Sequence, residues 1–335
     1  MPDHGLHKTP AITMNSIELC AGAGGQALGL ERSGFEHQVL VEIDAHACAT
    51  LRHNRPHWLV HEGDLSAFDA RAYQGIDLVA GGVPCPPFSK AGKQLGADDE
   101  RDLFPQAMRV VEETRPQAVM LENVRGLLDA VFTDYRQKIA RQLQALGYWT
   151  DWHLFNAADF GVCQLRPRVV VEALRRDLAE HFRWPAPSFQ LPPTVGELLG
   201  DLMGAQGWQG LEAWKERAND IAPTLVGGSK KHGGPDLGPT RAKQAWASLG
   251  VDGRGLVDAP PAPDFVGMPR LTVRMCARIQ GFPDEWAFVG KKTPAYRQVG
   301  NAFPPPVAHA VSRQIAQAIE AAAQARVSRT SLRAA

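Results

Sequence analysis

"SIELCAGAGGQALG", residues 16–29, joins an apolar strand pattern to a glycine-rich turn and then to a helix pattern. Gly22, Gly24 and Ala27 fit the spacing G-x-G-x-x-A, in which glycines let the backbone approach a ligand closely. Glu42 ends the next strand pattern, where an acid can hold the hydroxyls of a ribose. These residues predict a site for a nucleoside-containing cofactor, either a dinucleotide or S-adenosylmethionine, which the glycine spacing does not distinguish. The structural alternative is a tight turn whose glycines serve only close packing.

Outward from this turn, strand and helix patterns alternate as far as about Leu174. Further strand patterns are "HQVLVEI" (37–43), "IDLVAGG" (76–82), "QAVMLENV" (117–124) and "RVVVEAL" (168–174). Helix patterns between them cover 26–34, 45–54, 101–114 and 134–147. This alternation predicts an α/β fold, with a mostly parallel sheet covered by helices on both faces.

The pattern changes from about Phe182 to Lys292, where Pro, Gly and Trp are frequent and periodic segments are few. We expect a second, smaller and irregular domain built from loops and short strands. The following stretch, "PPPVAHAVSRQIAQAIEAAAQ" (304–324), has a proline start and helical periodicity. It predicts a helix that packs back on the large domain.

Composition limits the class of protein. The 335 residues carry no formal net charge, which argues against a protein that is basic throughout but allows a local basic face. The 5 cysteines are odd in number and lack a CxxC pair, so neither a disulfide framework nor a metal site is expected. Without a long apolar stretch or signal-like N-terminus, the sequence predicts a cytoplasmic protein that does not contact a membrane.

A second motif, "AGGVPCPPFSKAG" (80–92), places Cys85 among prolines directly after a strand pattern. The carboxyl ends of strands are where open α/β sheets bind ligands, and the flanking prolines restrict the loop. Glu122 ends the next strand pattern, so the thiol and the carboxylate are expected to face one crevice. This pairing favours a nucleophile with a catalytic acid over a buried structural cysteine and a salt-bridge glutamate.

"CQLRPRVVV" (163–171) leads into another strand pattern with Gln164, Arg166 and Arg168. The two arginines point the same way on an extended chain. They are suited to hold a phosphate, a carboxylate or a base edge, or to lower the pKa of a nearby thiol. Asp64, in "HEGDLSAFD", is suited either to bind an adenine amino group or to cap a helical turn.

In this order the motifs resemble those of the bacterial DNA (cytosine-5)-methyltransferases. The segments that carry the resemblance are "ELCAGAGG" (18–25), "GGVPCPPFS" (81–89), "ENV" (122–124), "QLRPR" (164–168), "RLTVRMCARIQGFPDEW" (270–286) and "YRQVGNAFPPPVAHAV" (296–311). The resemblance runs from about Ile17 to Ala318, and six motifs in order are far more specific than any one of them. It implies a Rossmann-like domain that uses S-adenosylmethionine and releases S-adenosylhomocysteine.

The resemblance also implies a mechanism. The Cys85 thiolate adds to C6 of a cytosine that has been flipped out of double-stranded DNA, and C5 then takes the methyl group. Glu122 contacts N3 and the exocyclic amine, Arg168 binds the carbonyl oxygen of the base, and Arg166 orders the site.

The implied cofactor site draws on both ends of the chain. Its residues are Cys20, Ala21, Gly22, Gly24, Gly25, Glu42, Ile43, Asp64, Leu65, Pro84, Asn301 and Ala302. Cys20 stands where the family usually has a phenylalanine that stacks on adenine. Because a thiol stacks poorly, we expect Ile43 to cover the other face of the ring.

The candidate DNA-contacting segment is "APTLVGGSKKHGGPDLGPTRAK" (222–243), in which lysines are suited to neutralise phosphates. Its structural alternative is a solvated loop with turn glycines. The predicted DNA-contacting residues are Ser89, Gln164, Thr224, Leu225, Lys230, Lys231, Arg241 and Lys243.

We therefore expect an N-terminal extension (1–13), a catalytic and cofactor-binding domain (14–181), a target-recognition domain (182–292), a returning C-terminal segment (293–325) and a flexible tail (326–335). A monomer at the nucleoid of a prokaryotic cell is expected, with a restriction endonuclease as a functional counterpart. The alternatives are an RNA cytosine-5 methyltransferase, a DNA-binding module without catalysis, and an NAD-dependent oxidoreductase suggested by the glycines alone.

Overall fold

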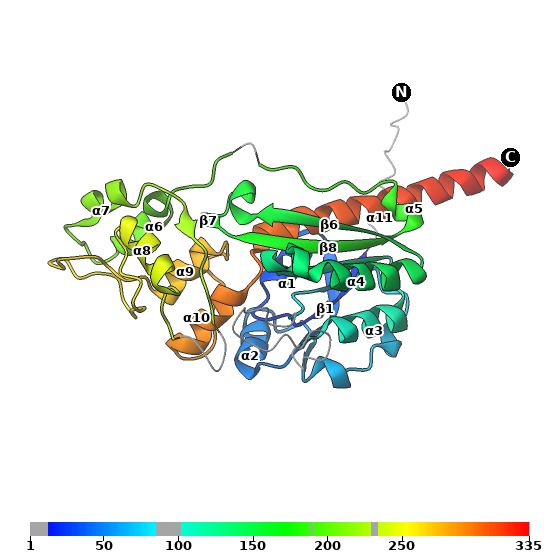
Figure 1. The fold of residues 1–335 in the computed structure, drawn as a ribbon, viewed down its shortest axis with the longest axis horizontal. Helices are drawn as coiled ribbons and strands as arrows, with labels where there is room; N and C mark the ends of the chain where they lie inside the picture. Colours follow the sequence, from blue (N-terminus) through cyan, green and yellow to red (C-terminus); the bar gives the residue numbers. More distant parts are fainter. Residues whose placement is uncertain (1–12, 85–101, 189, 229–233, 335) are drawn as a thin grey trace, which may run out of the picture.

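The computed structural model describes residues 13–84, 102–188, 190–228 and 234–334. It consists of a sheet covered by helices and, beside it, a smaller lobe of loops and short helices (Figure 1). The chain crosses into the lobe after the sheet is complete and returns to the sheet with its last helix.

A seven-stranded sheet with the order β3-β2-β1-β4-β5-β8-β6 forms the centre of the large part. In this order, each strand from β3 to β5 runs parallel to the next one. Strand β8 is antiparallel to both β5 and β6. The bounds are β1 (Met14–Leu19), β2 (Phe35–Glu42), β3 (Val60–Glu62), β4 (Leu78–Gly81), β5 (Ala118–Val124), β6 (Tyr148–Asn156) and β8 (Pro167–Arg175). The predicted α/β fold with a mostly parallel sheet is confirmed.

Strand β6 was not expected from the sequence. Its segment, "YWTDWHLFN", lies at the edge of the sheet, where most of its side chains are partly or fully exposed. An edge strand needs no continuous apolar run, so the pattern that revealed the central strands is missing here.

Each face of the sheet packs on its own set of helices. Alternate residues such as Ile17 and Leu19 pack on α3 (Phe104–Thr114) and α4 (Thr133–Ala145). The opposite face, with Leu78 and Met120, packs on α11 (Pro305–Ala334) and on α1 (Gly25–Arg32) through its Leu30. The other elements of this part are α2 (Ala45–Asn54), α5 (Arg176–Ala179), η1 (Leu65–Ala67), η2 (Arg71–Tyr73), η4 (Arg125–Leu128), η5 (Ala130–Phe132) and η6 (Ala157–Phe160).

Helix α11 returns to α1 through a close crossing. A Cβ at Gly29 would lie 2.5 Å from the Cβ of Ala308, so glycine allows the two backbones to approach. The Oγ atoms of Ser33 and Ser312 lie 2.7 Å apart beside the crossing. The helix continues to residue 334, through residues for which the sequence predicts a flexible tail.

The smaller lobe is built mostly from loops, as expected, but its regular elements are short helices, and β9 is the one strand among its described residues. Its elements are α6 (Val195–Met203), α7 (Leu211–Arg217), α8 (Thr240–Ser248), α9 (Val273–Ile279), α10 (Lys292–Asn301) and β9 (Ala222–Pro223), which pairs with β7 (Gln164–Leu165). These helices are too short to show periodicity in a Pro- and Gly-rich background. Trp208, Trp214 and Trp246 are buried in one core that the lobe shares with α1 and α2.

Two glycines allow the segment 226–228 to contact α10. A Cβ at Gly300 would overlap the backbone nitrogen of Gly227, and a Cβ at Gly227 would lie 2.5 Å from Oδ1 of Asn301. Because the obstructing atoms at Gly300 belong to the backbone, they cannot move aside as the end of a long side chain would.

We expect Gly300→Ala to destabilise the protein by about 2 kcal/mol, because overpacking at a backbone contact forces the two segments apart. Urea unfolding measures this change. The matched control is Gly234→Ala, since a Cβ at Gly234 would have nothing within 4 Å. Equal stability of both variants and the wild-type protein would show that this contact is not tight.

Candidate active site

A cavity of about 310 Å³ opens at the carboxyl ends of β1, β2, β4 and β5. Every residue predicted for the cofactor lines it except Gly24, whose position is enclosed by Leu51 and Trp286. The volume lies in the range of small-molecule sites in proteins. The cavity therefore gathers, from distant parts of the sequence, the residues expected at one site.

The turn between β1 and α1 forms the floor of the cavity. Cys20 and Gly22 both have φ of 53°, in the left-handed region that favours glycine. Glu42 fixes this turn, since its Oε2 accepts a hydrogen bond from the backbone N–H of Gly22 at 2.7 Å. Its Oε1 accepts from the backbone N–H of Ile43 at 2.9 Å and of Asp44 at 2.7 Å. The carboxylate is thus held at the edge of the cavity before any ligand binds.

Burial raises the pKa of the Cys20 thiol to about 12. A neutral thiol at this place offers a small, polarisable surface to a ligand and no negative charge. Ile43, which is exposed, lies on the same cavity and supplies an aliphatic surface.

Glu18 and Gln26 line the cavity and were missed in the sequence interpretation. Both side chains are buried, and neither oxygen of Glu18 nor Oε1 of Gln26 has a hydrogen-bond partner among the described residues. Burial is the largest cause that raises the pKa of Glu18. Buried polar atoms without partners are costly, so they indicate a polar ligand group. The signal was present in the sequence: a glutamate in the otherwise apolar strand "SIELC" has no structural reason to be there.

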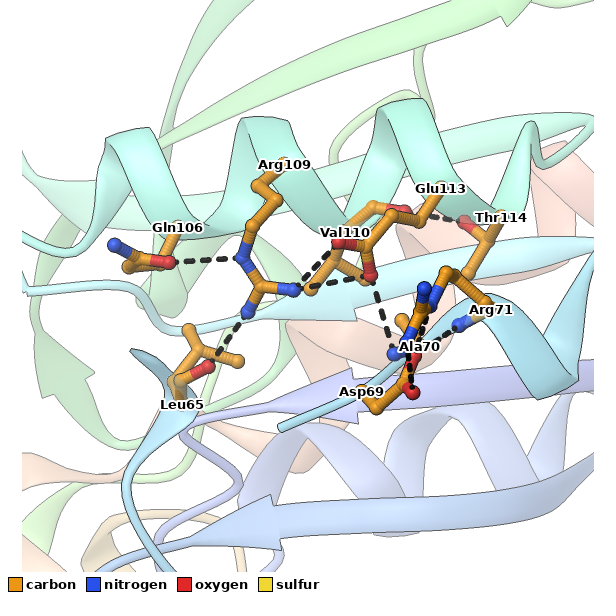
Figure 2. A network of polar contacts seen from close by, with 9 residues as sticks. All are labelled: Leu65, Asp69, Ala70, Arg71, Gln106, Arg109, Val110, Glu113 and Thr114. Carbon is orange, nitrogen blue, oxygen red and sulfur yellow. Dashed lines mark hydrogen bonds and ion pairs between the residues drawn. The ribbon is translucent and has the colours of Figure 1, made fainter. Parts of the chain in front are cut away.

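Asp64 and Leu65 form one wall of the cavity. The Oδ1 of Asp64 accepts from the backbone N–H of Ser66 at 2.8 Å, so the capping role considered for it is present, while its side chain also faces the cavity. Arg109 on α3 donates from Nη2 to the carbonyl of Leu65 at 2.8 Å (Figure 2). Nη1 of Arg109 also donates to Oε1 of Glu113 at 2.8 Å, so α3 holds this wall in place.

We expect Arg109→Ala to weaken binding of S-adenosylhomocysteine about three- to tenfold, because the wall loses a hydrogen bond that fixes it. Isothermal titration calorimetry measures the change, with Arg141→Ala, an exposed position on α4, as the control. Unchanged affinity in the Arg109 variant would show that the wall does not need this support.

Residues 286–303 pack on the glycine turn, and those from 294 onward line the cavity. Nε1 of Trp286 donates to the carbonyl of Ala23 at 3.1 Å, inside the glycine turn. A Cβ at Gly25 would overlap the carbonyl oxygen of Phe303, so glycine is needed where the two ends of the chain meet. Asn301 lines the cavity and donates from Nδ2 to the carbonyl of Gly228 at 3.2 Å.

Strands β4 and β5 are neighbours, as the sequence predicted, and their carboxyl ends meet at the cavity. Cys85 and Ser89, which follow β4, lie outside the described residues. Asn123 donates from Nδ2 to the carbonyl of Val83 at 2.8 Å and so fixes the backbone that leads to Pro84. This positioning residue was not recognised from the sequence.

Glu122 forms an ion pair with Arg168, whose Nε lies 2.8 Å from Oε1. Both side chains are nearly buried, with 11% and 13% exposed. Burial raises the pKa of Glu122, and the neighbouring Arg168 and Arg166 oppose this rise. A carboxyl group with a raised pKa at the edge of a cavity is suited to give a proton to a bound ring.

Arg166 is completely buried and connects three segments. It donates from Nη1 to the carbonyl of Leu225 at 2.8 Å, and from Nη2 to those of Gly300 at 2.8 Å and Ala302 at 3.0 Å. These bonds occupy the donors that a phosphate would need. Burial is the largest cause that lowers the pKa of Arg166. The geometry therefore agrees with an ordering role.

Gln164 and Leu225 have no exposed surface to offer DNA, so the prediction of direct contact is wrong for both in this structure. Gln164 donates to Oε1 of Gln280 at 2.6 Å and accepts from the backbone N–H of Leu225 at 2.8 Å. The two residues join β7 to the lobe, because polar groups in a buried seam must bond to one another.

The other predicted DNA contacts fall into three groups. Arg241 is exposed and Thr224 partly so, with the Oγ1 of Thr224 donating to the carbonyl of Leu165 at 2.5 Å. Lys243 pairs with Asp236 at 2.9 Å, so its charge is matched within the lobe. Lys230 and Lys231 lie outside the described residues.

Within the described ranges, no helix has the length and apolar character needed to cross a membrane. Nor do the described side chains include three or more His, Cys, Asp or Glu residues placed to hold a metal ion.

Comparison with known proteins gives consistent matches. The sequence model of a family described as C-5 cytosine-specific DNA methylase matches residues 14–317. The Type II methyltransferase M.NgoMIV of Neisseria gonorrhoeae is 58% identical over 312 residues, covering 92% of this chain and 99% of that protein. M.NaeI of Lentzea aerocolonigenes, another Type II methyltransferase, is 56% identical over 313 residues, covering 92% and 76%. A solved DNMT2 mutant from Spodoptera frugiperda has the same fold, with a TM-score of 0.64 at 17% identity over 90% of this chain and 99% of that chain.

Proposed function

The chain belongs to the C-5 cytosine-specific DNA methylase family and is a sequence-specific DNA (cytosine-5)-methyltransferase, and we propose how its residues divide this reaction. The observation that carries the proposal is the Glu122–Arg168 pair, which lies at the cavity beside the strand end that leads to Cys85. An acid at the edge of the cavity and a cation paired with it support a role for both residues in holding the flipped base.

We propose that the cavity holds S-adenosylmethionine, which supplies the methyl group when bound. Glu42 accepts hydrogen bonds from the ribose hydroxyls, and Asp64 accepts one from the adenine amino group. Cys20 and Ile43 flank the ring. The unpartnered oxygens of Glu18 fit a group that donates hydrogen bonds, which supports a polar ligand at the inner end of the cavity.

The Cys85 thiolate forms a bond to C6 of the cytosine, which makes C5 nucleophilic. Glu122 holds a proton at N3 and so relieves the negative charge that builds on the ring. Arg168, fixed by Glu122, donates to the carbonyl oxygen of the base. After C5 has been methylated, loss of its proton allows the C6–sulfur bond to break, and the thiolate returns to Cys85.

We further propose that the smaller lobe recognises the DNA target, that the protein acts as a monomer, and that it protects the site of a companion restriction endonuclease. The Type II classification of the similar methyltransferases supports the last point. The lobe contacts DNA through its exposed residues and not through Leu225, which is buried. Gln164 of β7 is also buried and makes no contact with DNA.

The decisive experiment is to methylate a random-sequence plasmid and map the product by bisulfite sequencing. We expect 5-methylcytosine at one position of one recurring sequence, and none when S-adenosylmethionine is omitted. Parallel reactions with tRNA test the RNA alternative. Methylation of tRNA without methylation of the plasmid would contradict the proposed function.

A further inference from the structure

Asp252 holds two arginines at one point on the surface of the smaller lobe. Its Oδ1 accepts from Nε of Arg254 at 2.8 Å and from the backbone N–H of Arg254 at 3.1 Å. Its Oδ2 accepts from Nη2 of Arg254 at 3.1 Å and from Nε of Arg270 at 2.9 Å. The side chain of Asp252 is 10% exposed, whereas those of Arg254 and Arg270 are 75% and 41% exposed. A nearly buried carboxylate therefore fixes two exposed guanidinium groups.

Both guanidinium groups retain donors. An arginine side chain carries five N–H donors in a fixed plane. Within the described ranges, Nη1 of Arg254 and both Nη atoms of Arg270 make no hydrogen bond, while the oxygens of Asp252 are already used. One carboxylate cannot neutralise two arginines, so this point keeps a positive charge and oriented donors.

A chain of contacts links this point to the cofactor cavity. Val226 lies against Gly300 beside the cavity and also against Gly238. The backbone N–H of Leu237 donates to the carbonyl of Gly253 at 3.0 Å, one residue before the first arginine. Contacts through Val226, Gly238 and Leu237 thus connect the backbone beside Arg254 to α10, which lines the cavity.

We propose that Arg254, supported by Asp252 and Arg270, recognises a guanine of the DNA target through its unused guanidinium donors. Guanine O6 and N7 lie side by side in the major groove and accept two hydrogen bonds from one guanidinium group. Because Asp252 already fixes the side chain, less conformational entropy is lost when the base binds. This inference rests on the proposed role of the lobe in target recognition and identifies the residue that carries it.

The test uses duplexes that contain the mapped target and duplexes in which each guanine is replaced in turn by 7-deazaguanine, which lacks the N7 acceptor. We expect the wild-type kcat/KM to fall about tenfold at one guanine. Arg254→Lys keeps the charge but loses the planar fork. It is expected to lose about tenfold on the unmodified target and nothing further at that guanine.

Arg176→Lys, an exposed arginine at the start of α5, is the matched control and should behave like the wild-type protein. An Arg254→Lys variant that remains as sensitive to 7-deazaguanine as the wild type would overturn the proposal. So would equal losses on all sequences, which indicate a phosphate contact, or a lower thermal stability that accounts for the lost activity, which indicates a structural role. If the wild-type protein itself fails to methylate the target, the proposed function is contradicted instead.

Discussion

Cys85→Ser is expected to reduce methylation by on the order of a thousandfold or more while leaving binding of S-adenosylhomocysteine nearly unchanged. A serine hydroxyl is a far weaker nucleophile than a thiolate, so the bond to C6 does not form. The described cavity is built by other residues, which is why the cofactor should still bind. Transfer of labelled methyl groups to duplex DNA and calorimetric titration measure the two effects separately.

A duplex that carries 5-fluorocytosine at the target position gives the direct readout. The wild-type protein should form a protein–DNA adduct that resists denaturation, because fluorine at C5 cannot leave as the proton does. Cys163→Ala, which removes a buried thiol away from the cavity, is the control and should form the adduct. Normal methylation without any adduct would rule out the covalent route.

Glu122→Gln is expected to lower kcat about 10²- to 10⁴-fold with little change in the KM for DNA. The amide of the glutamine still accepts a hydrogen bond from Arg168 but cannot give a proton to N3. Because the substitution preserves shape and leaves Arg168 with a partner, the loss belongs to the chemical step and not to folding.

Glu112→Gln, at an exposed position on α3, is the matched control and should leave kcat unchanged. Single-turnover methylation rates separate chemistry from product release. A Glu122→Gln variant with a kcat within twofold of the wild type would remove Glu122 from the role of acid.

The sequence predicted the central strands because each is a short, mostly apolar run. Parallel strands place their carboxyl ends at one edge, so the strand patterns predicted one crevice for Cys85 and Glu122. Glu122 lines the cavity, and Cys85 lies outside the described residues. The order of the motifs then predicted that Asn301 returns to the same cavity, which lies beyond the reach of local patterns.

The remaining features depend on packing that no local pattern records. The short helices of the lobe are stabilised by buried tryptophans and not by their own periodicity. Gln164 and Leu225 seemed suited to DNA by position, yet only the fold shows that β7 and the lobe enclose them. The Asp252 cluster joins residues whose backbones are brought together by the pairing of Asp252 N–H with the carbonyl of Pro269 at 2.9 Å.

The meeting of Gly25 with Phe303 also constrains how the enzyme comes into being. A ribosome makes the glycine turn long before it makes Phe303, so the nascent chain lacks a complete donor site throughout that interval. Contacts so distant in sequence form late and slowly. The capacity to methylate DNA is therefore acquired only after Phe303 has been translated, and a product terminated before that residue would be catalytically silent.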